Sequence, residues 1–306
     1  MQDKSDRREK ALIIGDLPHR YLDEWEITSD LALAEAKMGV HLEQVPAAEL
    51  IAHYGRLRPD ELNQATALAE RLVTETSERS PFPVAMPEVA KAARLYVALK
   101  GFVAQRGANA VTIDCGPFYQ GADTSLPCAA LTLLQDAGIA AGCQVDVDAL
   151  LTMILFKRVT DQPTFMGGPL ESEGYLAVSH CAMPLRMAGL DASQQPYCLG
   201  GHHGAETDPT IRTRLPAGVT VTLARLTRNL ERLILVAGTI AGSRGEIEGS
   251  PCCNTLLVEV PDLAKLRSVI KGFQYHLIVA RGDHTEPLAD LAQRLEIVIT
   301  PGGTQP

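Results

Sequence analysis

The stretch ALIIG, Ala11–Gly15, is the first strongly apolar run of the chain, and it sets the expected fold. Four apolar residues that end at a glycine are typical of a strand buried on both faces of a parallel sheet. A helix-like segment at residues 28–38 follows, and the alternating run 40–45 predicts the next strand. Because strands and helices continue to alternate to about residue 160, we expect a parallel-sheet, Rossmann-like α/β domain.

The second half of the chain has a different pattern of apolar and turn-forming residues. Short apolar or alternating runs are separated there by glycine and proline, which is typical of an antiparallel barrel or sandwich. We therefore predict an α/β domain at residues 1–162 and an antiparallel β-barrel domain with flanking helices at residues 163–306. The strands predicted after residue 45 are 110–113, 176–178, 219–225, 233–238, 255–260 and 275–280. The predicted helices are 28–38, 59–78, 87–105, 127–137, 147–159, 262–271 and 287–295.

The composition limits the classes of function. The chain has 306 residues and a net charge of −9, which argues against a general nucleic-acid binder because such proteins carry a basic face. Its seven cysteines follow no framework spacing, so we expect reduced thiols. The charged N-terminus has no signal-peptide core, and the longest apolar stretch, 233–241, is too short to span a bilayer. We therefore expect a soluble, cytoplasmic protein with no membrane partner.

Histidines in the second half are the main candidates for chemistry. His180 and Cys181 follow an apolar strand, and His276 lies at the start of the predicted strand 275–280. Imidazoles at strand ends suit metal binding or proton transfer, and the alternative is a buried, hydrogen-bonded structural histidine. Gly201-His-His-Gly204 places His202 in a glycine-rich loop, where adjacent histidines either bind a ligand or form an exposed turn.

Acidic and thiol groups supply further candidates. Asp146 precedes a predicted helix, so it is either an N-cap or a metal ligand or base. Asp114, directly after strand 110–113, is a candidate for binding substrate. Cys252-Cys253 cannot readily form a disulfide with each other, and we interpret both as small apolar residues entering a strand. The motifs GxGxxG, GxxxxGK[ST], HExxH and GxSxG are absent, which leaves phosphate loops and serine-hydrolase elbows poorly supported.

Six short stretches share their order and spacing with a known enzyme family. They are Pro127–Leu131, Gly142–Asp146, Pro163–Phe165, Ser179–Cys181, Pro216–Arg225 and Gly272–His276, the last continuing to Gly282-Asp283. On these stretches the chain resembles the L-fucose/L-arabinose isomerase family, from about Leu12 to Ile299. Each stretch is weak alone, but together they are fairly specific. The resemblance implies the family's second α/β domain followed by its C-terminal β-barrel domain, without the first α/β domain.

The resemblance also implies a chemistry. Family members are aldose–ketose isomerases in which a divalent ion, usually manganese, holds two sugar oxygens while a proton passes between adjacent carbons through an enediol. His180 and His276 match the histidine positions. Gln144 stands where the family has a glutamate, and Gly167-Gly168 where it has a second acid. We therefore expect weak divalent binding, or none, unless Asp146 joins the two histidines in a softer metal site that would suit zinc.

Three hypotheses about function follow. The first is an enzyme acting on a small polyol, sugar or sugar acid by proton transfer next to a carbonyl, with Asp146, His276 and Cys181 in catalysis. The residues then expected to bind substrate are Gln144, His202 and Asp114, and the metal ligands are His180, His276 and Asp146. The second is a metal-free lyase or decarboxylase on the same scaffold, and the third is a non-catalytic carbohydrate-binding protein. A neighbouring subunit covers the active site in long family members, so we also expect a homo-oligomer.

Overall fold

The first part of the chain forms a parallel sheet. The computed structural model describes residues 9–17, 29–119, 123–270 and 276–302. The strands are Glu9–Ile14 (β1), Val40–Val45 (β2), Ala110–Ile113 (β3) and Ala140–Cys143 (β4). They lie in the order β2-β1-β3-β4, and every pairing is parallel. These parallel pairings confirm the predicted parallel-sheet α/β arrangement, and the apolar residues 11–14 of β1 are fully buried as expected.

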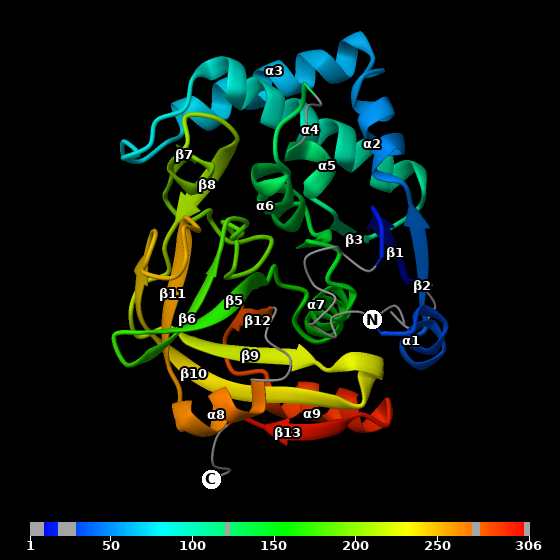
Figure 1. The fold of residues 1–306 in the computed structure, drawn as a ribbon, viewed down its shortest axis with the longest axis vertical. Coiled ribbons are helices and arrows are strands. Elements are labelled where there is room, and N and C mark those ends of the chain that lie inside the picture. The colour runs from blue at the N-terminus through cyan, green and yellow to red at the C-terminus, as the bar shows by residue number, and fades with distance from the viewer. Residues whose placement is uncertain (1–8, 18–28, 120–122, 271–275, 303–306) are drawn as a thin grey trace.

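Helices connect these strands, with three in succession between β2 and β3 (Figure 1). They are Leu31–Met38 (α1), Ala47–Tyr54 (α2), Pro59–Thr74 (α3), Met86–Gln105 (α4), Gly116–Tyr119 (α5), Cys128–Asp136 (α6) and Val147–Thr160 (α7). Helices α3, α4, α6 and α7 lie close to their predicted ranges. The eight-residue helix α2 was not predicted, because it is short and begins directly after Pro46 at the end of β2.

The second part of the chain is built mainly on a seven-stranded sheet. Its strands are Phe165–Ser172 (β5), Tyr175–His180 (β6), Thr220–Leu226 (β9), Arg232–Arg244 (β10), Asn254–Glu259 (β11), Leu277–Arg281 (β12) and Val298–Pro301 (β13). The order is β11-β6-β5-β12-β9-β10-β13, and β11 also pairs with β10. A separate hairpin pairs Tyr197–Gly201 (β7) with Pro209–Thr213 (β8), and the helices are Leu263–Ile270 (α8) and Thr285–Arg294 (α9).

This sheet is mixed, whereas we predicted an antiparallel β-barrel. Its pairings are antiparallel except that β13 lies parallel to β10. Strands β10 and β12 run in the same direction because each is antiparallel to β9. Helix α9 connects β12 to β13, and a helical crossover returns the chain in its starting direction, so β13 is parallel to β10. The predicted β-rich second part is thus confirmed, in the form of a large mixed sheet, and the barrel stays a prediction.

Helix α7 joins the two sheets. It contacts β3 and β4 of the parallel sheet and β9 and β12 of the mixed sheet (Figure 1). Its residues 147–156 are all buried, as expected of a helix that is apolar on every side. One apolar core therefore includes Ile13 of β1, Leu155 of α7 and Ile278 of β12. The division into domains at residue 162 stays a prediction. In the described part of the chain, no helix has the length and apolarity needed to cross a membrane.

The carboxylate of Asp136, at the end of α6, gives the fold a pH dependence that can be measured. Its Oδ1 accepts hydrogen bonds from the backbone N–H groups of Leu185 and Arg186, each at 2.9 Å. Its Oδ2 is buried without a hydrogen-bond partner among the described residues. Burial, opposed by those N–H groups and Arg186, raises the pKa of Asp136 from 3.8 to about 6.

We expect the Asp136→Asn variant to gain stability relative to the wild type as pH rises. Folding raises the pKa of Asp136, so this carboxyl loses its proton at a lower pH in the unfolded chain than in the folded chain. The wild type therefore loses stability as the pH rises from about 4 to about 6. The change from 3.8 to about 6 corresponds to about 3 kcal/mol. Urea unfolding at about pH 4 and about pH 7.5 measures it. The exposed Asp191→Asn variant controls for the lost charge. A difference in unfolding free energy between Asp136→Asn and the wild type that does not change with pH would contradict the expectation.

Candidate active site

The candidate site begins at the carboxyl end of the parallel sheet, where β4 leads into α7. In open α/β sheets ligands bind at this edge. Gln144 and Val145 both have positive φ angles, of 60° and 47°. This left-handed region is rare for residues with a side chain, and rarer for a β-branched one, so the surrounding structure must hold the turn in place. The turn ends at Asp146, whose side chain caps α7 by accepting a hydrogen bond from the Ala149 N–H at 2.9 Å.

Asp146 also belongs to a buried charged cluster with Arg225 and His276. Arg225 Nη1 lies 2.8 Å from each Asp146 carboxylate oxygen, and His276 Nδ1 donates to Oδ2 at 2.9 Å. All three side chains are at most 2% exposed. Burial acts to raise the pKa of Asp146, but Arg225 and His276 outweigh it and hold the pKa below its usual value. Burial lowers the pKa of His276 despite the opposing effect of Asp146. The cluster therefore pairs a carboxylate with a neutral imidazole near neutral pH.

A cavity of about 230 Å³ lies beside this cluster. Thiols and imidazoles dominate its lining: Cys115, Cys128, Cys143, Cys181, Cys252, His180, His202, His203 and His276. The other lining residues are Tyr119, Leu126, Gln144, Gly168 and Ser179. Among the described residues, no Asp, Glu, Lys or Arg lines it. Such a cavity offers proton-transfer and soft ligand groups but no side chain with a permanent charge.

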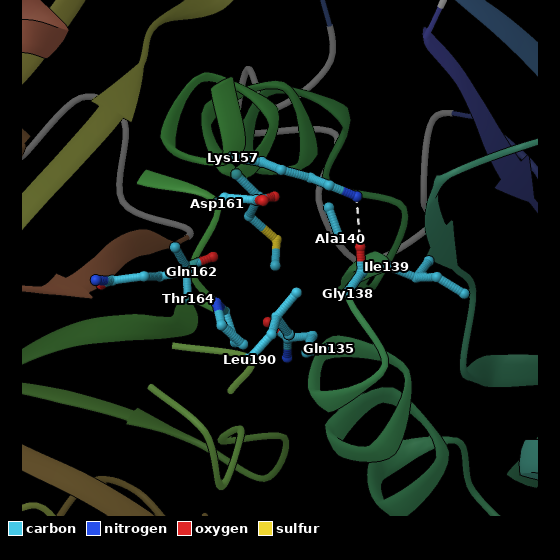
Figure 2. Close-up of a pocket in the computed structure, with 11 residues that line it drawn as sticks. Gln135, Gly138, Ile139, Ala140, Lys157, Asp161, Gln162, Thr164 and Leu190 are labelled. Atoms are coloured by element: carbon cyan, nitrogen blue, oxygen red, sulfur yellow. Dashed lines mark hydrogen bonds between the residues drawn. The ribbon is translucent and has the colours of Figure 1, made fainter. Parts of the chain in front are cut away.

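A second cavity, drawn in Figure 2, is too small to hold a sugar. It lies between the end of α6 and the end of α7, and Lys157 donates there to the carbonyl of Gly138. Burial lowers the pKa of Lys157. The volume of about 20 Å³ is roughly what one water molecule needs. The thiol- and imidazole-lined cavity is therefore the better candidate for a substrate site.

Five residues form what we call the thiol–imidazole wall of the larger cavity: Cys128, Cys181, Cys252, His202 and His203. They come from the start of α6, the end of β6, the turn before β11 and the turn after β7. Cys128 Sγ lies 3.6 Å from His202 Nδ1, and Cys252 Sγ lies 3.6 Å from His203 Nε2. The two imidazoles stack with ring centroids 3.7 Å apart. Four separate segments thus bring sulfur and nitrogen atoms together.

Hydrogen bonds within the wall shift the pKa values of its thiols. A hydrogen bond with Cys181 lowers the pKa of Cys128 to about 6, against the effect of burial and with help from His202. A second hydrogen bond with Cys181, aided by His203, lowers the pKa of Cys252 to about 3. The pKa of Cys181, the common partner, lies well above its usual value. Cys128 and Cys252 therefore carry thiolate character at neutral pH.

His180 lies next to His276, with ring centroids 5.2 Å apart. Burial lowers the pKa of His180 to about 4, so this imidazole is neutral near neutral pH. Its Nδ1 is buried and has no hydrogen-bond partner within the described part of the chain. A buried imidazole nitrogen without a partner carries a desolvation cost, which a bound ligand would remove.

The structure brings most of the candidates from the sequence together. Gln144, His180, Cys181, His202 and His276 all line the larger cavity. The two predicted acids lie elsewhere. Asp146 is behind His276 and bonds to it and to Arg225, and Asp114 accepts a hydrogen bond from the Gly116 N–H at 2.8 Å. Their direct contact with substrate or metal stays a prediction.

Several lining residues were not singled out from the sequence. Cys115 and Cys143 lie at the carboxyl ends of β3 and β4, a position that could have marked them. His203 belongs to the adjacent-histidine motif Gly201–Gly204 and Cys128 to the matching stretch Pro127–Leu131, but neither was given a role of its own. Cys252, interpreted from the sequence as a small apolar residue, instead lines the cavity beside His203.

The lining does not fit the hard divalent ion that the family resemblance implies. Manganese needs hard oxygen ligands, and carboxylates supply most of them. Gln144 and Gly168 line the cavity at the positions where the resemblance places acids. The carboxylate of Asp146 is already bonded to Arg225 and His276. The lining therefore does not supply the ligands of such an ion.

An α/β scaffold with a cavity at the carboxyl edge of its parallel sheet is the usual setting of a small-molecule enzyme. The chain is similar to the protein named sulfoquinovose isomerase of Clostridium sp. (strain MSTE9), at 28% identity over 270 residues. The match covers 85% of this chain and 58% of that protein, so the chain spans little more than half the length of this relative. No family model matches the chain. The relationship is thus to a sugar isomerase.

Proposed function

We propose that the chain converts a sugar or sugar acid by moving a proton next to a carbonyl, as aldose–ketose isomerases do. The observation that carries this proposal is the hydrogen-bonded pair of Asp146 and His276 at the cavity. The similarity to a sugar isomerase supports it. The finer resemblance to the fucose/arabinose isomerases, including a barrel-shaped second domain, belongs to the same proposal, and the pairing of β11 with both β6 and β10 supports it.

His276 acts as the acid–base group in this proposal. An N–H on Nδ1 that donates to Asp146 favours the tautomer in which Nε2 carries the lone pair, and that nitrogen can accept a proton. The proton leaves the carbon next to the carbonyl and returns to the former carbonyl carbon, while a hydroxyl proton moves between the two oxygens. The atoms and electrons balance without an oxidant. Asp146 is a positioning residue, since it acts through the imidazole.

The cavity suits a small ligand with several hydroxyl groups. Its volume of about 230 Å³ lies just below the range of about 300–1,000 Å³ for drug-sized ligands. The Gln144 amide and the Ser179 hydroxyl can bind hydroxyl oxygens there. The relative's name points to a sugar that carries a sulfonate. Because no Lys or Arg lines the described part of the cavity, we propose a sugar or sugar acid more generally. We also propose a homo-oligomer whose neighbouring subunit covers the cavity.

Proton exchange with solvent tests the proposed function. In D2O we expect the full chain to interconvert an aldose and its ketose and to place deuterium on the carbon next to the carbonyl. NMR of a panel of aldoses, ketoses and sugar acids, with sulfoquinovose included, measures both the product and the label. Smaller fragments or released CO2 would instead indicate a lyase or decarboxylase. Ligand-induced stabilisation without any turnover would indicate a carbohydrate-binding protein, and either outcome would reject the isomerase.

A further inference from the structure

We propose that the thiol–imidazole wall binds a thiophilic divalent ion, Zn²⁺ in particular, with Cys181 as the shared ligand. Two groups of side chains place their ligand atoms within 4.8 Å of one another. One contains Cys128, Cys181 and His202, and the other contains Cys181, Cys252 and His203. This site differs from the predicted set of Asp146, His180 and His276, and it does not depend on the proposed isomerisation.

The spacing of the ligand atoms matches zinc coordination. Zn–S bonds of about 2.3 Å and Zn–N bonds of about 2.0–2.1 Å at a tetrahedral angle put sulfur and nitrogen roughly 3.6 Å apart. The sulfur–nitrogen distances of Cys128 to His202 and of Cys252 to His203 are both 3.6 Å. A metal could therefore replace the thiol hydrogen bonds with little movement of either pair.

A second contact orients one of the imidazoles for this role. His202 uses Nδ1 towards Cys128, and its Nε2 lies 2.6 Å from the Tyr119 hydroxyl. Metal-binding histidines usually donate their other ring N–H to a nearby oxygen, which fixes the tautomer and the ring orientation. When Nε2–H donates to Tyr119, the Nδ1 lone pair is available to an ion bound beside Cys128.

The donor atoms of the cavity also favour a soft cation. Its lining offers thiol sulfur and imidazole nitrogen atoms, and among the described residues no carboxylate lines it. Thiolate and imidazole ligands select zinc and similar ions, whereas manganese prefers oxygen. The same cavity that lacks the acids for manganese thus presents the donor set for zinc.

Metal analysis of the full chain tests this site without reference to activity. In protein purified without a metal-affinity tag, we expect at least about one zinc per chain by mass spectrometry. Cys181→Ala removes the ligand common to both groups and is expected to lower zinc affinity at least tenfold. Cys198→Ala is the matched control, because Cys198 is also buried but does not line the cavity. Equal zinc content in the two variants would overturn the proposal.

Cobalt substitution gives a second readout that reports the ligands themselves. Co²⁺ added to the metal-free chain is expected to give a thiolate-to-cobalt charge-transfer band in the wild type and Cys198→Ala and to lose it in Cys181→Ala. If Cys181→Ala does not fold, the exposed His203→Ala replaces it and is expected to weaken Co²⁺ binding severalfold. No band in folded, reduced wild type, or copper in place of zinc, would overturn the proposal. Zinc bound without any sugar turnover would reject the isomerase and support this site.

Discussion

Replacement of Arg225 by methionine is expected to lower the free energy of unfolding by about 3–5 kcal/mol. Arg225 is 1% exposed and donates to both oxygens of the fully buried Asp146. Methionine matches much of the arginine stem but leaves the carboxylate without its cation. An unpaired charge in the interior is costly, and His276 alone is neutral near neutral pH and cannot compensate it. Urea unfolding followed by circular dichroism measures the loss.

Two further variants make the Arg225 experiment specific. Arg232→Met removes an exposed arginine from the neighbouring strand β10, and its expected effect is within about 0.5 kcal/mol. The double variant Asp146→Asn/Arg225→Met has no unpaired carboxylate at this position and is expected to recover part of the lost free energy of unfolding. If Arg225→Met lowers the free energy of unfolding no more than Arg232→Met does, the buried Arg225–Asp146 pair contributes little to stability.

The first half of the fold could be predicted from the sequence because its signals are local. Residues 11–14 are apolar without interruption, and a strand buried on both faces needs such a run. The pairing of the strands in the second half is harder to predict, and the barrel stays a proposal. Alternating runs such as 219–225 show that a strand has one buried face, but they do not show which strands pair. The parallel partner of β10 is set by the α9 crossover, which no single run reveals.

The candidate site was only partly predictable for a related reason. His180 and His276 were singled out because each lies at the end or start of an apolar run that predicts a strand, and because both match histidine positions of the family resemblance. Cys128 opens a helix, and no local pattern there marks a site, whereas the adjacent histidines of Gly201–Gly204 left binding and an exposed turn equally open for His203. Asp146 was correctly weighed as an N-cap, yet its bond to His276, 130 positions further along the chain, is a tertiary contact. The residue types limit which reactions and ligands a site can support, and the tertiary packing decides which side chains come into contact.

The largest expected effect on activity is at His276. His276→Gln is expected to lower kcat by about 10²–10⁴-fold, the usual contribution of a general acid–base group, on whichever sugar the deuterium panel identifies. Glutamine keeps a polar side chain of similar length but cannot exchange a proton with the substrate carbon. His41→Gln, at an exposed position on β2, is the matched control and is expected to leave kcat unchanged. A His276→Gln enzyme within tenfold of the wild type would exclude His276 as the base.

Asp146→Asn distinguishes positioning from bulk structure. The side-chain amide that this substitution introduces would donate a hydrogen bond to His276 Nδ1. This hydrogen bond favours the tautomer with the proton on Nε2, so Nε2 no longer has a lone pair that can accept the substrate proton. We therefore expect kcat to fall by about as much as in His276→Gln while KM changes little, because the cavity lining is untouched. Nitrogen-15 NMR of the histidine rings reports the tautomer directly, and unfolding curves show whether the loss of the Arg225 partner has weakened the fold. A fall in stability with an unchanged tautomer and unchanged kcat would assign Asp146 to the fold alone.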